Sequence, residues 1–271
     1  MIPSTYKIRQ TICEVGQRLY RFRMVASNDG NISYRIDDGH IIATPTGVCK
    51  GDMTPERLVT VDIHGRVKGG GRPSSELAMH LFIYQQRPDV SAVVHAHPIY
   101  ATAFATAGLA MNECVLPEIV LTLGAIPLAP YGTPSTHELP DSLRPYVQDH
   151  DAILLANHGA VTFGRDLWDA YFKMERLEHY AQILFLARQL GGERGLASPE
   201  VEKLREIRQK FGLSGPAPEC IVTDMRQHHG DDCQCGKRTQ ASGTDIKRLI
   251  DDIYQEVKHD FWPERRSGRS N

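Results

Sequence analysis

Long apolar runs are missing from this chain of 271 residues. No stretch approaches the roughly 20 apolar residues that a membrane-spanning helix requires. The first ten residues, MIPSTYKIRQ, also lack the apolar segment of a secretory signal. We therefore expect a cytoplasmic protein with no membrane partner.

A strong net charge is missing as well. The formal charge is −2 and hydrophobic residues make up 41% of the chain, both ordinary for a soluble globular protein. Because no excess of basic residues is present, we expect no nucleic-acid partner. The length allows one large domain or two small ones, with a sizeable core in either case.

Cysteine is sparse, and the chain is too long to need a disulfide framework. We expect reduced thiols at all six positions. The cysteines are Cys13, Cys49, Cys114, Cys220, Cys233 and Cys235.

The centre of the chain is residues 72–98, RPSSELAMHLFIYQQRPDVSAVVHAHP. Ser74 and Ser75 are suited to cap a helix with apolar positions at helical spacing, and Pro88 follows where that helix should end. Glu76 is then expected in the first turn. The helix therefore holds a carboxylate close to the histidine-bearing segment that follows it.

Two histidines follow in the apolar, β-branched run VSAVVHAH, which predicts a strand. His95 and His97 are two residues apart, so both imidazoles leave the strand on the same face and form a pair of metal ligands. A catalytic zinc usually takes three protein ligands. The candidate for the third is His158, at the end of the buried strand ILLA and next to Gly159. A lone histidine is more often a packed or surface residue, and the paired spacing is what favours a metal site.

Several small hydrogen-bonding residues stand in loops around this unit. Taken singly they are turn residues. If three such loops converged beside a helix amino terminus, their amides and hydroxyls would bind an anion. The sequence alone does not show that convergence. The residues are Asn31, Thr46, Gly47, Ser74 and Ser75.

The remaining chain up to residue 212 predicts alternating helices and strands. Helices are expected at residues 4–26, 139–148, 167–190 and 198–211, the third capped by Asp166. A hairpin is expected at 32–44, further strands at 58–63 and 153–156, and strand pieces in the proline-interrupted segment 115–132, best defined at 126–130.

The chain changes character after Gly212, and we expect a carboxy-terminal extension over residues 213–271. An amphipathic helix is predicted near its end, at residues 244–262. The polar loop before it carries a cluster that could hold a second zinc, but CxC is shorter than the usual CxxC spacing, so a disordered or partner-bound loop is favoured. That cluster is His228, His229, Cys233 and Cys235.

The motifs GNISYR, TPTGV, RPSSE, AVVHAHP and NHGAVTFG, in this order, resemble the class II aldolase/adducin family, and within it the fuculose-phosphate aldolases most. The resemblance spans about residues 5–190. It implies that residues 1–212 form an α/β catalytic domain, a single-domain α/β/α sandwich around a central, largely antiparallel sheet. It also implies a homotetramer with active sites at subunit interfaces.

The resemblance assigns roles to individual residues. His95, His97 and His158 match three zinc ligands, with one Zn²⁺ per subunit, and Glu76 matches the catalytic acid/base. The positions that match the loops holding the substrate phosphate are Gly30, Asn31, Thr46, Gly47, Ser74 and Ser75. One position departs from the fuculose-type pattern: Glu118 stands nearest to where those enzymes place a tyrosine from the adjacent subunit.

The resemblance favours a zinc-dependent aldolase that cleaves a ketose 1-phosphate, of the fuculose or 5-deoxypentulose type, to dihydroxyacetone phosphate and an aldehyde. Alternatives within the family are an L-ribulose 5-phosphate 4-epimerase, a methylthioribulose 1-phosphate dehydratase and a decarboxylase of an oxo sugar-acid phosphate. The epimerases of the family resemble one another in carrying PSSD where this chain has PSSE, and this difference favours the aldolase. A non-enzymatic scaffold of the adducin type is disfavoured because this chain retains the ligand set.

Overall fold

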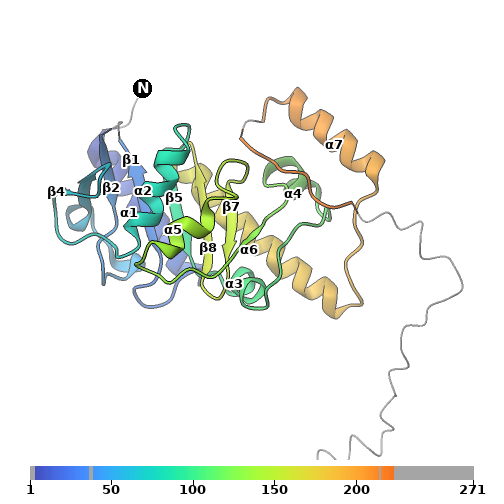
Figure 1. Ribbon diagram of the computed structural model, residues 1–271, viewed down its shortest axis with the longest axis horizontal. Coiled ribbons are helices and arrows are strands. Elements are labelled where there is room, and N and C mark those ends of the chain that lie inside the picture. The colour runs from blue at the N-terminus through green and yellow to red at the C-terminus, as the bar shows by residue number, and fades with distance from the viewer. Residues whose placement is uncertain (1–3, 37–38, 214, 223–271) are drawn as a thin grey trace, which may run out of the picture. The chain divides into compact units, whose positions relative to one another are not determined.

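Among the described residues, 4–36, 39–213 and 215–222 of the computed structural model, eight strands form one sheet (Figure 1). The strands are β1 (Asn31–Arg35), β2 (His40–Ala43), β3 (Val59–Asp62), β4 (Val67–Gly69), β5 (Ala92–Ala96), β6 (Leu128–Ala129), β7 (Ala152–Leu155) and β8 (Gly159–Gly164). Their order is β4-β3-β2-β1-β5-β8-β7-β6. Every neighbouring pair is antiparallel except β6 and β7, which confirms the predicted largely antiparallel sheet.

Helices cover both faces of the sheet (Figure 1). They are α1 (Thr5–Arg21), α2 (Leu77–Gln86), α3 (Ile99–Thr106), α4 (Pro117–Thr122), α5 (Glu138–Leu143), α6 (Leu167–Gln189) and α7 (Ser198–Lys210). α1, α3 and α6 bury residues such as Ile12 and Leu177 with Val94 of β5, whereas α2 and α5 bury residues such as Ile83 with Val93. This split follows from the alternation of side chains along a strand. The result is the α/β/α sandwich that the resemblance implied.

Several predicted elements are confirmed. β1 and β2 form the expected hairpin, and His158 lies in the turn between β7 and β8. α6 begins where predicted, because the Asp166 carboxylate accepts hydrogen bonds from the amides of Trp168 and Asp169, both at 2.9 Å. α7 lies within the predicted residues 198–211.

Three local predictions are wrong. Residues 117–122 form the helix α4 instead of a strand piece, because Pro117 occupies the first helical turn, where its missing N–H costs nothing. α5 ends at Leu143, earlier than predicted. Glu76 directly precedes α2 and does not lie in its first turn; its amide donates to the Ser74 hydroxyl at 3.3 Å.

The cysteine prediction is corrected for one pair. Cys114 and Cys220 form a disulfide across 106 residues of sequence, while Cys13 and Cys49 are free. A chain that needs no disulfide framework can still contain a disulfide. This one lies in a small apolar cluster outside the main core. Residues 217–221 also bond to the body: the amide of Ala125 donates to the carbonyl oxygen of Pro218 at 3.0 Å.

The remaining carboxy-terminal predictions lie outside the described residues. These are the cluster at His228, His229, Cys233 and Cys235 and the amphipathic helix at residues 244–262. The boundary predicted at residue 212 stays a prediction. Among the described helices, none has the combination of length and apolar character needed to cross a bilayer.

Candidate functional site

The three predicted histidine ligands lie together where the inner strands β5 and β7 end. His95 is on β5, His97 lies just past its end, and His158 lies in the turn between β7 and β8. Their ring centroids are 4.9, 4.7 and 5.0 Å apart, and one potential ligand nitrogen from each ring lies within 4.8 Å of the others. The close approach needs Gly159, since an added Cβ there would lie 2.7 Å from the His97 ring. The spacing of His95 and His97 thus brings both rings to the same place as His158, and their role as metal ligands stays a prediction.

Two rings of this cluster, those of His95 and His97, are in the neutral state that a metal ligand requires. His95 donates from Nδ1 to the carbonyl oxygen of Ala160 at 2.9 Å, so its Nε2 carries the lone pair and lies 3.1 Å from Nε2 of His97. Burial lowers the pKa of His95 to about 3 and also lowers the pKa of His97, which keeps both rings neutral. Nδ1 of His158 is buried without a hydrogen-bond partner among the described residues. Three imidazoles in this arrangement fit a divalent transition-metal ion and leave a coordination position open.

Glu76 faces the histidines from the start of α2. One carboxylate oxygen, Oε2, accepts a hydrogen bond from Nδ2 of Asn31 at 2.8 Å and lies 3.4 Å from Nε2 of His95. The other, Oε1, lies 3.1 Å from Nε2 of His158 but is buried without a properly oriented hydrogen bond. Burial raises the pKa of the carboxyl, whereas His95 and His158, when either ring carries a proton, and the hydrogen bond from Asn31 lower it below its usual range. A buried carboxylate beside a metal-binding cluster is suited to exchange protons with a ligand there.

The predicted anion-binding loops come side by side. The amide of Thr46 donates to the carbonyl oxygen of Arg72, and the amide of Ser74 donates to that of Thr44, both at 3.0 Å. The amide of Ile32 donates to the Thr44 hydroxyl at 3.2 Å, which brings the start of β1 to the same place. Thr46, Gly47 and Ser75 are exposed and Ser74 is half-buried, so their polar groups are open to a ligand, whereas Gly30 and Asn31 are buried. The structure supplies the convergence that the sequence could not show.

Sequence reasoning missed Lys50, which ties two of these loops together. Lys50 is 1% exposed, and its Nζ donates to the carbonyl oxygens of Asn28 at 2.8 Å and Val48 at 2.7 Å. Burial lowers the pKa of this ammonium group. Its position three residues after Gly47 in TPTGVCK was the available signal, although a lysine in a loop is usually solvated.

His80 was missed as well. Its imidazole is 1% exposed and lies within hydrogen-bonding distance of Asn31 and Ser33, at 2.5 and 2.7 Å. The signal was its position four residues after Glu76, which would place both residues on one side of the helix predicted from the sequence. Asn31 therefore uses its side chain to bond Glu76 and His80, in addition to its predicted place in a phosphate loop.

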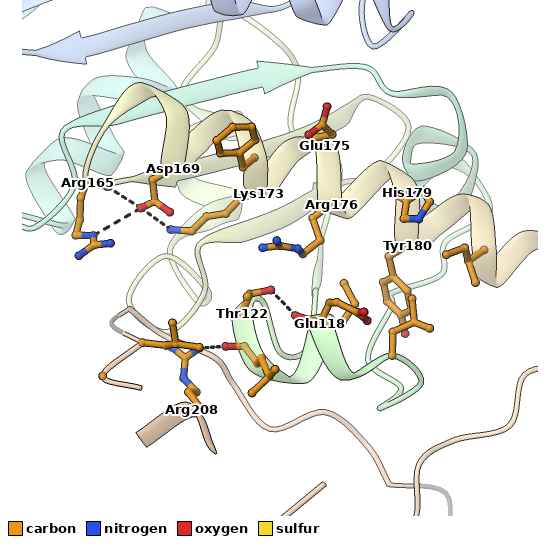
Figure 2. A pocket seen from close by; sticks show the side chains of 17 residues that line it. Glu118, Thr122, Arg165, Asp169, Lys173, Glu175, Arg176, His179, Tyr180 and Arg208 are labelled. Carbon is orange, nitrogen blue, oxygen red and sulfur yellow. Dashed lines mark hydrogen bonds and ion pairs between the residues drawn. The ribbon is translucent and has the colours of Figure 1, made fainter. Parts of the chain in front are cut away.

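A separate cavity of about 910 Å³ lies between α4, α6 and residues 208–213, with no lining residue in common with the histidine cluster (Figure 2). Glu118 points into this space from α4, and Arg176 and His179 face it from α6. Glu118 therefore lines a cavity that the three histidines do not line. A role for Glu118 in catalysis would require a second copy of the chain.

Comparison with known proteins agrees with the resemblance. Residues 10–185 match the class II aldolase and adducin N-terminal domain. The 3-oxo-tetronate 4-phosphate decarboxylase of Escherichia coli CFT073 is 34% identical over 204 residues, 73% of this chain and 95% of that protein. The L-fuculose phosphate aldolase of Methanococcus maripaludis C7 is 38% identical over 172 residues, 64% of this chain and 93% of that protein. The crystal structure of YgbL from Klebsiella pneumoniae has a TM-score of 0.70 at 32% identity and covers 75% of this chain and 100% of that one.

Proposed function

The chain belongs to the class II aldolase and adducin family, and we propose that it is a metal-dependent decarboxylase of a 3-oxo sugar-acid phosphate, yielding dihydroxyacetone phosphate and carbon dioxide. The observation that carries the proposal is the meeting of His95, His97 and His158 with Glu76, from segments far apart in sequence. The relatives named 3-oxo-tetronate 4-phosphate decarboxylase support this substrate class. The reaction differs from the ketose 1-phosphate cleavage that we expected from the sequence.

The chemistry requires a place for negative charge. In a 3-oxo acid, the bond between the carboxylate carbon and C2 breaks, and its electron pair forms an enediolate across C2 and C3. His95, His97 and His158 would hold a zinc ion, which would supply positive charge to stabilise an enediolate. The carbon that lost the carboxylate then takes up a proton, and Glu76 is placed to exchange that proton with solvent.

The phosphate end of the substrate needs an anion site. We assign it to the three converging loops, with Lys50 behind them as a buried positive charge. The loop residues that we propose to contact the phosphate are Gly30, Asn31, Thr46, Gly47, Ser74 and Ser75. Binding at these loops fixes which end of the substrate faces Glu76.

A second candidate is cleavage of a ketose 1-phosphate, favoured by the 38% identity to L-fuculose phosphate aldolase. It forms the same enediolate of dihydroxyacetone phosphate, but it also requires proton transfer at the oxygen of the departing aldehyde. The fuculose-type enzymes use a tyrosine there, and this chain has Glu118 at the nearest position. Carbon dioxide leaves without that proton transfer, so the decarboxylase requires one catalytic group fewer.

The test begins with the step that both reactions share. The zinc-loaded protein should exchange one hydroxymethyl proton of dihydroxyacetone phosphate with D₂O, as followed by NMR. 3-Oxo-tetronate 4-phosphate should then give carbon dioxide and dihydroxyacetone phosphate faster than fuculose 1-phosphate gives its aldehyde. Glu76→Gln should keep the zinc and lose roughly 10²- to 10⁴-fold in both exchange and turnover, whereas Glu14→Gln, an exposed control on α1, should lose neither. Faster cleavage of fuculose 1-phosphate would refute the decarboxylase in favour of the aldolase.

Two further parts of the proposal concern the metal and the assembly. We propose zinc because neutral imidazoles suit it better than they suit magnesium, and restoring the chelated protein with zinc, manganese or magnesium in turn tests this choice. We propose a homotetramer with sites at subunit interfaces, which would bring Glu118 of one subunit towards a neighbouring site. Sedimentation equilibrium of the purified protein measures the subunit number.

A further inference from the structure

A chain of hydrogen bonds leads from the interior of the protein to the Glu76 carboxylate. The oxygen atoms of Tyr84 and Ser33 are 2.8 Å apart, and the Ser33 oxygen is 2.7 Å from Nδ1 of His80. Nε2 of His80 is 2.5 Å from Oδ1 of Asn31, whose Nδ2 is 2.8 Å from Oε2 of Glu76. We infer that His80 is a positioning residue that holds the Asn31 amide in the one orientation that donates to Glu76.

The direction of each hydrogen bond follows from the final acceptor of the chain, the Glu76 carboxylate. An ionised carboxylate only accepts hydrogen bonds, so Asn31 must turn its NH₂ group towards Glu76. The amide oxygen of Asn31 then faces His80, which must be protonated at Nε2. Nδ1 of His80 is left with a lone pair and accepts the Ser33 proton. Every donor in the chain therefore points towards Glu76.

The outer end of the chain is fixed in the same way. Because Ser33 gives its only proton to His80, its oxygen accepts from the Tyr84 hydroxyl. The Tyr84 hydroxyl also lies 3.4 Å from the carbonyl oxygen of Ser91, a longer and weaker contact. Ser33 is wholly buried and Tyr84 almost so. A buried chain with all its members paired orients each of them strongly.

A neutral histidine suits this position because it has one donor and one acceptor. Burial lowers the pKa of His80 to about 4, so the ring is uncharged near neutral pH. Without the Nε2 proton, the Asn31 oxygen would lose its donor, and of the two partners of the amide among the described residues only the Glu76 carboxylate would still hold it. The amide and the carboxylate that it contacts would then be less firmly oriented for proton exchange.

His80 acts indirectly, through Asn31. The inference rests on the proposed function in one respect, that Glu76 exchanges the proton. Among the described residues, no hydrogen bond or ion pair joins His80 to the three ligand histidines. Asn31 has no group that passes a proton at neutral pH, so the chain orients Glu76 and does not relay protons to it. Removing the chain should slow the proton-exchange step and leave the metal in place.

Kinetics of two variants in the zinc-loaded, full-length protein test this role. His80→Met keeps similar bulk without an N–H, and its kcat for proton exchange of dihydroxyacetone phosphate should fall about 10- to 100-fold, with zinc content unchanged and KM altered less than kcat. His80→Gln places an amide N–H near the former Nε2 and should restore kcat to within about threefold of the wild type. Ile83→Ala, a buried control on the same helix, should lower the melting temperature but not kcat. Wild-type kcat in His80→Met, or equal loss in His80→Gln and His80→Met, overturns the inference.

A second measurement separates this inference from the proposed function. Nitrogen-15 NMR of the zinc-loaded protein should show His80 protonated at Nε2 and unprotonated at Nδ1. Protonation at Nδ1 overturns the inference whatever reaction the protein catalyses. If the wild type fails to exchange the proton of dihydroxyacetone phosphate, the proposed function fails, and the tautomer of His80 still decides whether it fixes the Asn31 amide.

Discussion

Asn31 and His95 lie directly opposite each other on the antiparallel strands β1 and β5. Opposed residues send their side chains to the same face of a sheet, and Oε2 of Glu76 lies 2.8 Å from Nδ2 of Asn31 and 3.4 Å from Nε2 of His95. One strand register therefore joins a phosphate loop, the carboxylate and the candidate metal ligands. A shift of one residue between β1 and β5 would turn one of the two side chains to the other face and dismantle the site.

Gly30→Ala should weaken the binding of the sugar phosphate. Gly30 has a φ of +73°, and an added Cβ would lie 2.6 Å from Cγ1 of Val25 and 2.8 Å from the carbonyl oxygen of His95. The left-handed backbone alone costs about 1–2 kcal/mol for a residue with a side chain, and the contacts force the loop to move. We expect KM for dihydroxyacetone phosphate to rise about tenfold, as 1.4 kcal/mol corresponds to tenfold in an equilibrium. Gly71→Ala is the control, because a Cβ there meets nothing within 4 Å. An unchanged KM in Gly30→Ala would contradict the assignment of this loop.

His95→Ala should abolish zinc binding and turnover together. The variant removes one of three ligands and leaves the Ala160 carbonyl oxygen without its N–H donor. Elemental analysis should find about one zinc per chain in the wild type and a trace in the variant. His137→Ala removes an exposed imidazole outside the site and should retain the metal. Stoichiometric zinc in His95→Ala would place the metal elsewhere in the protein.

The stability of the metal-free protein should fall as the pH falls from about 6.5 to about 4. Burial lowers the pKa of His80 from 6.5 to about 4, against an opposing effect of the Glu76 charge. Within this range the unfolded chain binds a proton that the folded chain does not, so the contribution is complete above pH 6.5 and is lost on acidification. At about 1.4 kcal/mol per pKa unit, the loss is on the order of 3 kcal/mol.

Urea denaturation at pH 7 and pH 4.5 measures this effect. His80→Gln should reduce the difference in the free energy of unfolding between the two pH values, because an amide does not titrate in this range, and the part that remains comes from His95 and His97. His137→Gln, which alters an exposed imidazole, should leave the wild-type difference intact. If wild type and His80→Gln lost the same free energy on acidification, the folded-state pKa of His80 would not be depressed.

Local patterns predicted the histidine cluster because its geometry is mainly local. Two residues separated by one position on a strand share a face, so the direction of His95 and His97 followed from β5 alone. α6 was predictable for the same kind of reason: Asp166 caps it and its apolar positions repeat at helical spacing. That His158 reaches the same point depends on β8 pairing with β5, a long-range contact that no local pattern specifies, so the sequence offered His158 as a candidate and the resemblance matched it to a ligand.

The remaining errors come from long-range contacts and from residues with two possible roles. Residues 117–122 are apolar enough for a strand, but they form a helix that begins at Pro117, a residue suited to the first helical turn. Asn31 was predicted for a phosphate loop, but its side chain also bonds His80 and Glu76, which no sequence pattern specifies. His80 was not singled out from the sequence, because a buried polar chain and a buried apolar stripe have the same helical spacing.

Reduction of the disulfide between Cys114 and Cys220 should destabilise the protein and release residues 217–221 from the body. In the chain-entropy description, a cross-link over about 100 residues stabilises the folded state by about 4–5 kcal/mol, and this pair is 106 residues apart. The two cysteines share a small apolar cluster with Val120 and Val201, so their separation also exposes apolar surface.

Denaturation with and without a reductant, after mass spectrometry has confirmed the bond, measures the loss for Cys114–Cys220. Cys220→Ser should already be destabilised and insensitive to the reductant, whereas Cys49→Ser, which removes a free thiol, should respond like the wild type. Alkylation of both Cys114 and Cys220 in protein purified without a reductant would show that the pair is not bonded. Because the histidine cluster lies outside this apolar cluster, we expect zinc content to survive reduction, so that the disulfide acts on the carboxy-terminal segment and not on the candidate metal site.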